Sequence, residues 1–244
     1  AKSGQVVMVE LTEQPSAHAQ PMGKITEILG NYADSGMEIE IALRKHNLPH
    51  EFSAEALRIA GAYPKSVQEA DFKGRIDCRD MPLITIDGET ARDFDDAVFA
   101  EPQGKGWRLV VAIADVSFYV KPKDALDTGA YDRGNSVYFP RRVIPMLPEA
   151  LSNGLCSLNP DVERLCMICD MQVDGHGIVK QYKFYPSVMR SKARMTYTQV
   201  HEILEHPEDA LAQEYAWLMP HLQHLQSVYK LMLTQREKRG AIEF

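Results

Sequence analysis

Four aspartates crowd into a short segment between two apolar runs. They are Asp87, Asp93, Asp95 and Asp96. The flanking runs are Pro82-Leu-Ile-Thr-Ile86 and Ala97-Val-Phe-Ala100, both typical of buried strands. In an extended chain Asp93 and Asp95 project to the same side, and a turn through Gly88 can bring Asp87 back toward them. Converging carboxylates at the mouth of a core repel one another, and a bound cation is the usual compensation. The segment therefore indicates a cation site between two strands.

The expected cation is Mg²⁺, which prefers hard oxygen ligands, keeps part of its water shell and takes phosphate oxygens as further ligands. Two such ions can stabilise both the attacking and the leaving oxygen in phosphodiester cleavage. A solvated acidic loop is the alternative for an arbitrary run of this kind. A calcium-binding EF-hand does not fit, because the spacing Asp-x-Asp-x-Asp-Gly is missing and the flanks are strands rather than helices.

Apolar periodicity predicts an α+β fold. The opening residues give two strands, Gln5–Leu11 and Met22–Leu29, and the chain then enters two helices. Ser35 and Glu38 have the spacing of a capping box for the first helix, and Ser53 begins the second. We expect a small β-module over residues 1–32, a helical connector over 33–79 and a mixed domain over 80–244.

The mixed domain is expected to contain both strands and helices. The predicted strands are Leu83–Ile86, Ala97–Ala100, Trp107–Ala114, Leu165–Val173 and Ile178–Tyr185. The predicted helices are Leu126–Arg133, Thr198–Glu205 and Trp217–Arg239. A further strand is expected to begin at residues 241–244.

Composition places few limits on function. The net charge of −7 argues against a simple nucleic-acid coat, although carboxylate-rich metal enzymes that act on phosphates remain compatible with it. The four cysteines suit reduced thiols, and no apolar run approaches the roughly 20 residues that cross a bilayer. We expect a cytoplasmic protein without membrane contact or a small-molecule cofactor, and the sequence predicts no oligomeric state.

Three further patterns carry little chemical signal. Cys166 and Cys169 have CxxC spacing, but no second pair accompanies them, so zinc is not expected. The eight histidines are scattered and form no Ser/His/Asp arrangement. Asp115 ends a predicted strand, where capping a turn is at least as good an explanation as metal binding.

The segment from Pro82 to Val98 closely resembles the signature of the ribonuclease II and ribonuclease R family of exoribonucleases. Other runs resemble the same family in the same order. They are Trp107–Ser117, Arg133–Pro140 and Ile144–Asn159, preceded by Gly23–Gly30 and Gly36–Arg44. The resemblance covers essentially the whole chain. It implies the end of a cold-shock domain, a partial OB-fold, followed by the N-terminal part of the mixed α/β catalytic (RNB) domain.

The resemblance also implies an activity and a set of roles. Members hydrolyse RNA processively from the 3′ end with Mg²⁺ and release nucleoside 5′-monophosphates. By motif match, Asp87 and Asp96 are expected as direct metal ligands, Asp93 as a further ligand with a part in catalysis, and Asp95 as the aspartate most critical for catalysis.

The resemblance assigns RNA contacts to a second group of residues. Tyr138 is expected to stack on the 3′-terminal base of single-stranded RNA, which suits sequence-independent binding because every base has a π-face. Arg141 and Arg142 are expected to contact phosphates. Without the resemblance, Tyr138 would be read as a core tyrosine and the two arginines as a solvated basic turn.

The sequence departs from the family in what it lacks. The family's Ser-Pro-Ile-Arg-Arg-Tyr motif and a later catalytic glutamate do not occur in this chain, nor do a first cold-shock domain and a basic S1 domain. We therefore expect a fragment of an exoribonuclease that alone is weakly active or inactive. A non-catalytic RNA-binding or scaffold module and an unrelated Mg²⁺ phosphatase are the alternatives.

Overall fold

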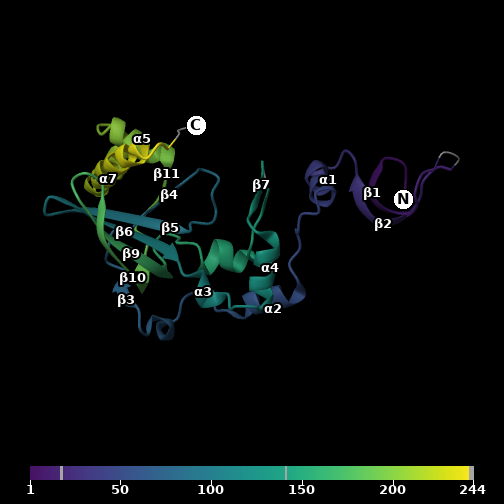
Figure 1. The fold of residues 1–244 in the computed structure, drawn as a ribbon, viewed down its shortest axis with the longest axis horizontal. Helices are drawn as coiled ribbons and strands as arrows, with labels where there is room; N and C mark the ends of the chain where they lie inside the picture. Colours follow the sequence, from purple (N-terminus) through teal and green to yellow (C-terminus); the bar gives the residue numbers. More distant parts are fainter. Residues whose placement is uncertain (17–18, 141, 242–244) are drawn as a thin grey trace. The chain divides into compact units, whose positions relative to one another are not determined.

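The computed structural model describes residues 1–16, 19–140 and 142–241, and it divides the chain into two compact units (Figure 1). The first unit comprises Ala1–Phe52 and Tyr131–Ile144, and the second comprises Ser53–Ala130 and Pro145–Phe244. The predicted domain limits at residues 32 and 79 stay a prediction. In the described part of the chain, no helix is both long enough and apolar enough to span a bilayer.

The first unit is built on two antiparallel strands, β1 (Gln5–Glu13) and β2 (Met22–Asn31), as predicted. Helix α1 (Met37–Lys45) follows β2 and buries Met37 and Leu43. The expected capping box at Ser35 and Glu38 is wrong, because the helix starts from Gly36 at φ 85° with no side-chain cap. Glycine adopts this left-handed conformation without the steric penalty that a Cβ brings.

A short hairpin completes the first unit. Strand β7 (Val137–Phe139) pairs with β8 (Arg142–Ile144), and Tyr138 lies opposite Val143. Three-residue strands are too short to show a periodic pattern, which explains why the sequence did not predict this hairpin.

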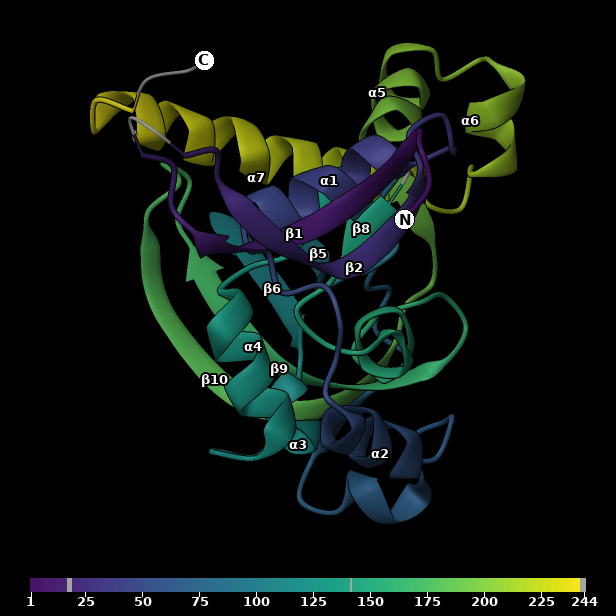
Figure 2. The ribbon, with the colours of Figure 1, turned by 90° about the vertical axis from the view of Figure 1, so that its right-hand side faces the viewer.

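The second unit contains a five-stranded sheet in the order β3-β10-β9-β6-β5 (Figures 1 and 2). These strands are β3 (Ile76–Cys78), β5 (Asp96–Gln103), β6 (Gly106–Ala114), β9 (Glu163–Val173) and β10 (Val179–Arg190). A separate parallel pair joins β4 (Thr85–Asp87) to β11 (Arg194–Thr196). The mixed α+β class is therefore confirmed.

The helices that lie wholly or mainly in the second unit include α7 (Met219–Lys238), which packs against β5 of the sheet. The others are α2 (Ala54–Ala62), α3 (Val116–Tyr119), α4 (Ala125–Arg133), α5 (Tyr197–Glu205) and α6 (Ala210–Glu214), with short helical turns at Glu69–Phe72 and Ala150–Leu155. The predicted N-cap Ser53 is confirmed, since its side chain accepts from the Ala56 amide at 3.1 Å. Val228 of α7 is buried against Ala100, Leu109 and Val173 of the sheet.

Strand β10 is longer than predicted because it continues through Pro186 to Arg190. Pro186 pairs with Met167 of β9, whereas β3 begins to pair with β10 only at Ser187. Pro186 therefore lies just outside the β10–β3 ladder. Proline has no amide hydrogen to donate, so it is found in sheets where no ladder hydrogen bond needs that donor.

Candidate metal centre

The acidic segment lies where two sheets of the second unit meet. Strand β4 ends at Asp87 and β5 begins at Asp96, and an antiparallel bridge between Ile84 and Val98 holds the two strands together. Asp93 and Asp95 lie in the irregular loop between them. Two strands that are adjacent in space thus place all four aspartates in one region.

Helix α5 starts beside this region. Thr196 lies opposite Asp87 in the parallel pair and caps α5, where its side chain accepts from the Gln199 amide at 3.1 Å. The next residue, Tyr197, is 64% exposed. Burial of its hydroxyl and the charges of Asp87 and Asp96 raise the pKa of Tyr197, so these three side chains lie close enough to interact.

The aspartates also perturb one another. Partial desolvation, followed by repulsion from Asp93, Asp96 and Asp87, raises the pKa of Asp95. Partial desolvation and repulsion from Asp87 raise the pKa of Asp96. Both residues are exposed, so water reaches their carboxylates although protein atoms surround part of each side chain. Raised carboxylate pKa values of this kind mark sites whose negative charge lacks local compensation.

The donor set fits a hard divalent cation in chemical type. It offers carboxylate oxygens from Asp87, Asp93, Asp95 and Asp96, whose mutual repulsion a cation would relieve. Across residues 1–16, 19–140 and 142–241, however, no three His, Cys, Asp or Glu side chains converge tightly enough to hold a metal ion. The backbone brings the carboxylates within electrostatic range, and the individual ligand roles stay predictions.

Asp115 is occupied by other partners. It forms an ion pair with Arg75 at 2.6 Å and accepts from the Ser117 hydroxyl at 2.7 Å. Burial opposes ionisation, but these hydrogen bonds and the charge of Arg75 lower the pKa of Asp115 overall. It is a buried partner of an arginine.

The CxxC cysteines are free thiols. Cys166 is buried and Cys169 is half-buried, and the two side chains point to opposite faces of β9. Burial raises the pKa of Cys166 to about 12, which disfavours the thiolate that a metal would need.

The RNA-contact residues suggested by the resemblance belong to the first unit. Tyr138 is 62% exposed on β7, so the alternative of a core tyrosine is wrong. Arg142 forms an ion pair with Glu40 of α1, which also pairs with Arg44. Arg141 lies outside the described residues.

Several residues around the aspartates were not singled out from the sequence. Arg194 of β11 stacks on the Phe94 ring at 4.3 Å and donates to the Ala91 carbonyl at 3.0 Å. The spacing of Thr196 and Gln199 is that of a capping box and could have located the start of α5 next to the site. No sequence signal could have identified the parallel partner of β4, because pairing between distant segments leaves no local pattern.

The chain matches two domain families and is similar to curated ribonuclease R proteins. Residues 75–244 match the RNB domain model and residues 1–53 match the cold shock domain model. Ribonuclease R of Vibrio cholerae is 54% identical over 100% of this chain and 30% of that protein, and ribonuclease R of Escherichia coli is 52% identical over the same shares. The chain thus spans about 30% of the length of these curated relatives.

Solved structures give the same result. A structure of Mycoplasma genitalium RNase R in complex with double-stranded RNA superposes with a TM-score of 0.89 at 29% identity, over 100% of this chain and 43% of that one. Yeast Ssd1, a pseudonuclease, superposes with a TM-score of 0.64 at 19% identity over 86% of this chain and 27% of that one, a likeness of fold alone. The family-model match over 75–244 and the matches to ribonuclease R show that the chain belongs to the RNB-domain family, with cold-shock-domain sequence ahead of the RNB domain.

Proposed function

We propose that the protein containing this chain is a Mg²⁺-dependent exoribonuclease. It hydrolyses single-stranded RNA, and structured RNA as well, processively from the 3′ end to nucleoside 5′-monophosphates. The observation that carries the proposal is the placement of four aspartates at the meeting point of β4, β5 and α5, where partial desolvation and neighbouring aspartates raise the pKa of Asp95 and of Asp96. Relatives at 54% and 52% identity named ribonuclease R support it.

In this proposal the four aspartates have different roles. Asp87 and Asp96, at the ends of two paired strands, are the direct ligands of Mg²⁺, and Asp93 is a further ligand. Asp95 is the aspartate on which hydrolysis depends most. Bound Mg²⁺ supplies charge stabilisation to the reacting phosphate and favours ionisation of a coordinated water.

The 3′ end of RNA is the proposed partner of the first unit. The exposed ring of Tyr138 suits stacking on a terminal base of any identity. Arg141 and Arg142 are proposed phosphate contacts, and a phosphate would compete with Glu40 for Arg142. The structures of Mycoplasma genitalium RNase R in complex with double-stranded RNA and with ribose-methylated single-stranded RNA support RNA as the ligand.

The second candidate is a non-catalytic RNA-binding or scaffold module with the same fold. Yeast Ssd1, named a pseudonuclease, shares the fold, so the fold alone does not decide between the two candidates. The four aspartates favour the nuclease instead. We further propose that the 244-residue chain alone is weakly active or inactive, and that the protein works in the cytoplasm.

A digestion of 5′-labelled single-stranded RNA separates these proposals. The full-length protein that contains this sequence should produce a descending ladder that ends in a short core when Mg²⁺ is present, and none when EDTA is present. Asp95→Asn should abolish the ladder while retaining RNA binding. Unchanged RNA under all conditions would support the scaffold, and vigorous digestion by the 244-residue chain would contradict the proposal that it is inactive alone.

A further inference from the structure

The loop that carries Asp93 and Asp95 has no regular secondary structure, yet much of its backbone is hydrogen-bonded. The Leu158 amide donates to the Phe94 carbonyl at 2.8 Å, and the Ala114 amide donates to the Asp95 carbonyl at 2.8 Å. An irregular loop on the protein surface would ordinarily bind water through such groups. Here the bonds come from the protein and fix the course of the backbone between the aspartates.

One buried side chain holds this loop at two points. The Ser157 hydroxyl accepts from the Phe94 amide at 3.1 Å and faces the Arg92 carbonyl at 3.5 Å. Its relative exposure is 0%. Ser157 belongs to the long matching run Ile144–Asn159, to which the proposed function assigns no role.

A buried arginine holds Ser157 in turn. Arg164 of β9 is 7% exposed, and its Nε donates to the Ser157 carbonyl at 2.7 Å. Its Nη1 donates to the Glu163 carbonyl at 2.8 Å. Within the described residues Arg164 has no carboxylate in ion-pair range, and burial lowers its pKa.

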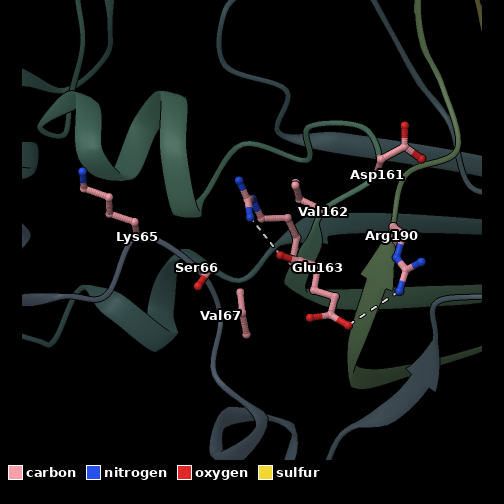
Figure 3. A pocket seen from close by; sticks show the side chains of 8 residues that line it. Lys65, Ser66, Val67, Asp161, Val162, Glu163 and Arg190 are labelled. Carbon is pink, nitrogen blue, oxygen red and sulfur yellow. Dashed lines mark hydrogen bonds and ion pairs between the residues drawn. The ribbon is translucent and has the colours of Figure 1, made fainter.

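The neighbouring carboxylate is already committed. Glu163 pairs with Arg79 at 2.8 Å and with Arg190 at 3.7 Å, and Figure 3 shows Glu163 directed toward Arg190 in a pocket of about 490 Å³. A buried guanidinium that lacks a carboxylate partner is costly to desolvate. The Arg164 guanidinium donates to the backbone carbonyls of Ser157 and Glu163, and Ser157 in turn contacts the aspartate loop.

We propose that Ser157 and Arg164 are positioning residues that fix the loop of Asp93 and Asp95 for cation binding. The chain of contacts runs from the Arg164 guanidinium to the Ser157 carbonyl, and from the Ser157 hydroxyl to the backbone on both sides of Asp93. This inference rests on the proposed function, because it assigns the pair to the same metal centre. Residues behind metal ligands commonly set metal affinity in this way.

Mn²⁺ binding, followed by electron paramagnetic resonance, tests the pair without relying on activity. Ser157→Ala should raise the Mn²⁺ dissociation constant of this chain about tenfold, within the usual range for such residues. Ser187→Ala is the matched control, since Ser187 is equally buried and its hydroxyl accepts only a long contact from the Cys78 thiol. It should leave the dissociation constant unchanged. An affinity of folded Ser157→Ala within twofold of the parent chain would overturn the proposal.

Two further measurements cover the case in which Ser157→Ala does not fold. Arg164→Lys keeps the charge but loses the guanidinium geometry, so weaker Mn²⁺ binding is expected, and parental affinity would count against the proposal. Amide exchange of the unmutated chain should show Phe94 and Leu158 strongly protected, and loop-like exchange at both amides would refute the positioning contacts. A parent chain that binds no Mn²⁺ while Phe94 stays protected would instead count against the proposed metal centre.

Discussion

Thr196 lies directly opposite Asp87 in the parallel pair of β11 and β4, and helix α5 begins at the next residue. The cap of one helix and the end of the acidic strand are therefore built on the same pair of residues. A loss of the cap should disturb the acidic site as well as the helix.

Thr196→Ala is expected to lower the free energy of unfolding by about 1 kcal/mol, the usual cost of removing a side-chain cap. The reason is that the Gln199 amide loses its acceptor at 3.1 Å. Thr196→Ser keeps a hydroxyl and is the matched control, with an expected loss of less than about 0.5 kcal/mol. Urea unfolding of both variants measures the difference, and equal stabilities would show that the cap does not hold α5.

Asp95→Asn should stabilise the chain in EDTA. The folded-state pKa values of Asp95 and Asp96 are raised above 3.8, so their favourable contribution is present below pH 3.8 and is lost as pH rises through the raised values. At neutral pH, repulsion among the ionised aspartates lowers the free energy of unfolding. Because asparagine removes one of the charges, Asp95→Asn should raise this free energy by on the order of 0.5 kcal/mol, or Tm by about 1–2 °C.

Mg²⁺ should produce the same relief in the unmutated chain. We expect the metal to raise Tm at pH 7, to lose this effect as pH falls and the aspartates protonate, and to have little effect on Asp87→Asn, which loses a proposed direct ligand. Glu208→Gln, which changes an exposed carboxylate outside the cluster, should respond to Mg²⁺ like the parent chain. A Tm rise that survives in Asp87→Asn would point to a different site.

The Glu40–Arg142 ion pair should tie the β7–β8 hairpin to α1. Hydrogen bonds from Arg142 and Arg44 lower the pKa of Glu40, although partial burial opposes them. The contribution of Glu40 is therefore present above pH 4.5 and is lost as pH falls through the lowered value. A double-mutant cycle with Glu40→Gln and Arg142→Met should give a coupling of about 0.5–1 kcal/mol at pH 7.

The same cycle on a more exposed pair provides the control. Arg58 and Glu55 form an ion pair on α2 with side chains 68% and 55% exposed. Their coupling should be smaller than that of Glu40 and Arg142, because water and salt screen it. A Glu40–Arg142 coupling no larger than this would mean that the pair does not anchor the hairpin.

Gly177→Ala should destabilise the second unit by about 2–4 kcal/mol. Gly177 has φ +81°, and a Cβ there would lie 2.6 Å from the Leu231 carbonyl oxygen of α7. Strain at positive φ costs about 1–2 kcal/mol, and the clash with α7 adds to it. Gly240 has the same φ but open space around it, so Gly240→Ala should show the strain alone. If thermal or urea unfolding shows the same loss of stability for both variants, α7 moves away from the new Cβ at no cost in free energy.

Long periodic elements could be predicted from the sequence, whereas pairings between distant segments could not. The predicted strand at Trp107–Ala114 became β6 (Gly106–Ala114), and the predicted helix at Trp217–Arg239 became α7. Strand β11 has only three residues and gains its place from parallel pairing with β4. Periodicity carries no information about such a partner.

At the candidate site, too, some residues could be predicted from the sequence and others could not. The aspartates are visible in the sequence because four of them stand close together between two apolar runs. Ser157 and Arg164 resemble ordinary surface residues until the fold buries them. Polar side chains that act through backbone hydrogen bonds have no composition signature, so only the three-dimensional contacts reveal them.

Anomalous diffraction from crystals soaked in Mn²⁺ tests the central claim most directly. The account predicts an anomalous peak about 2.0–2.2 Å from carboxylate oxygens of at least two of the four aspartates, reduced when excess Mg²⁺ is added and absent from Asp87→Asn crystals. Strong Mn²⁺ peaks elsewhere with none between β4 and β5 would contradict it.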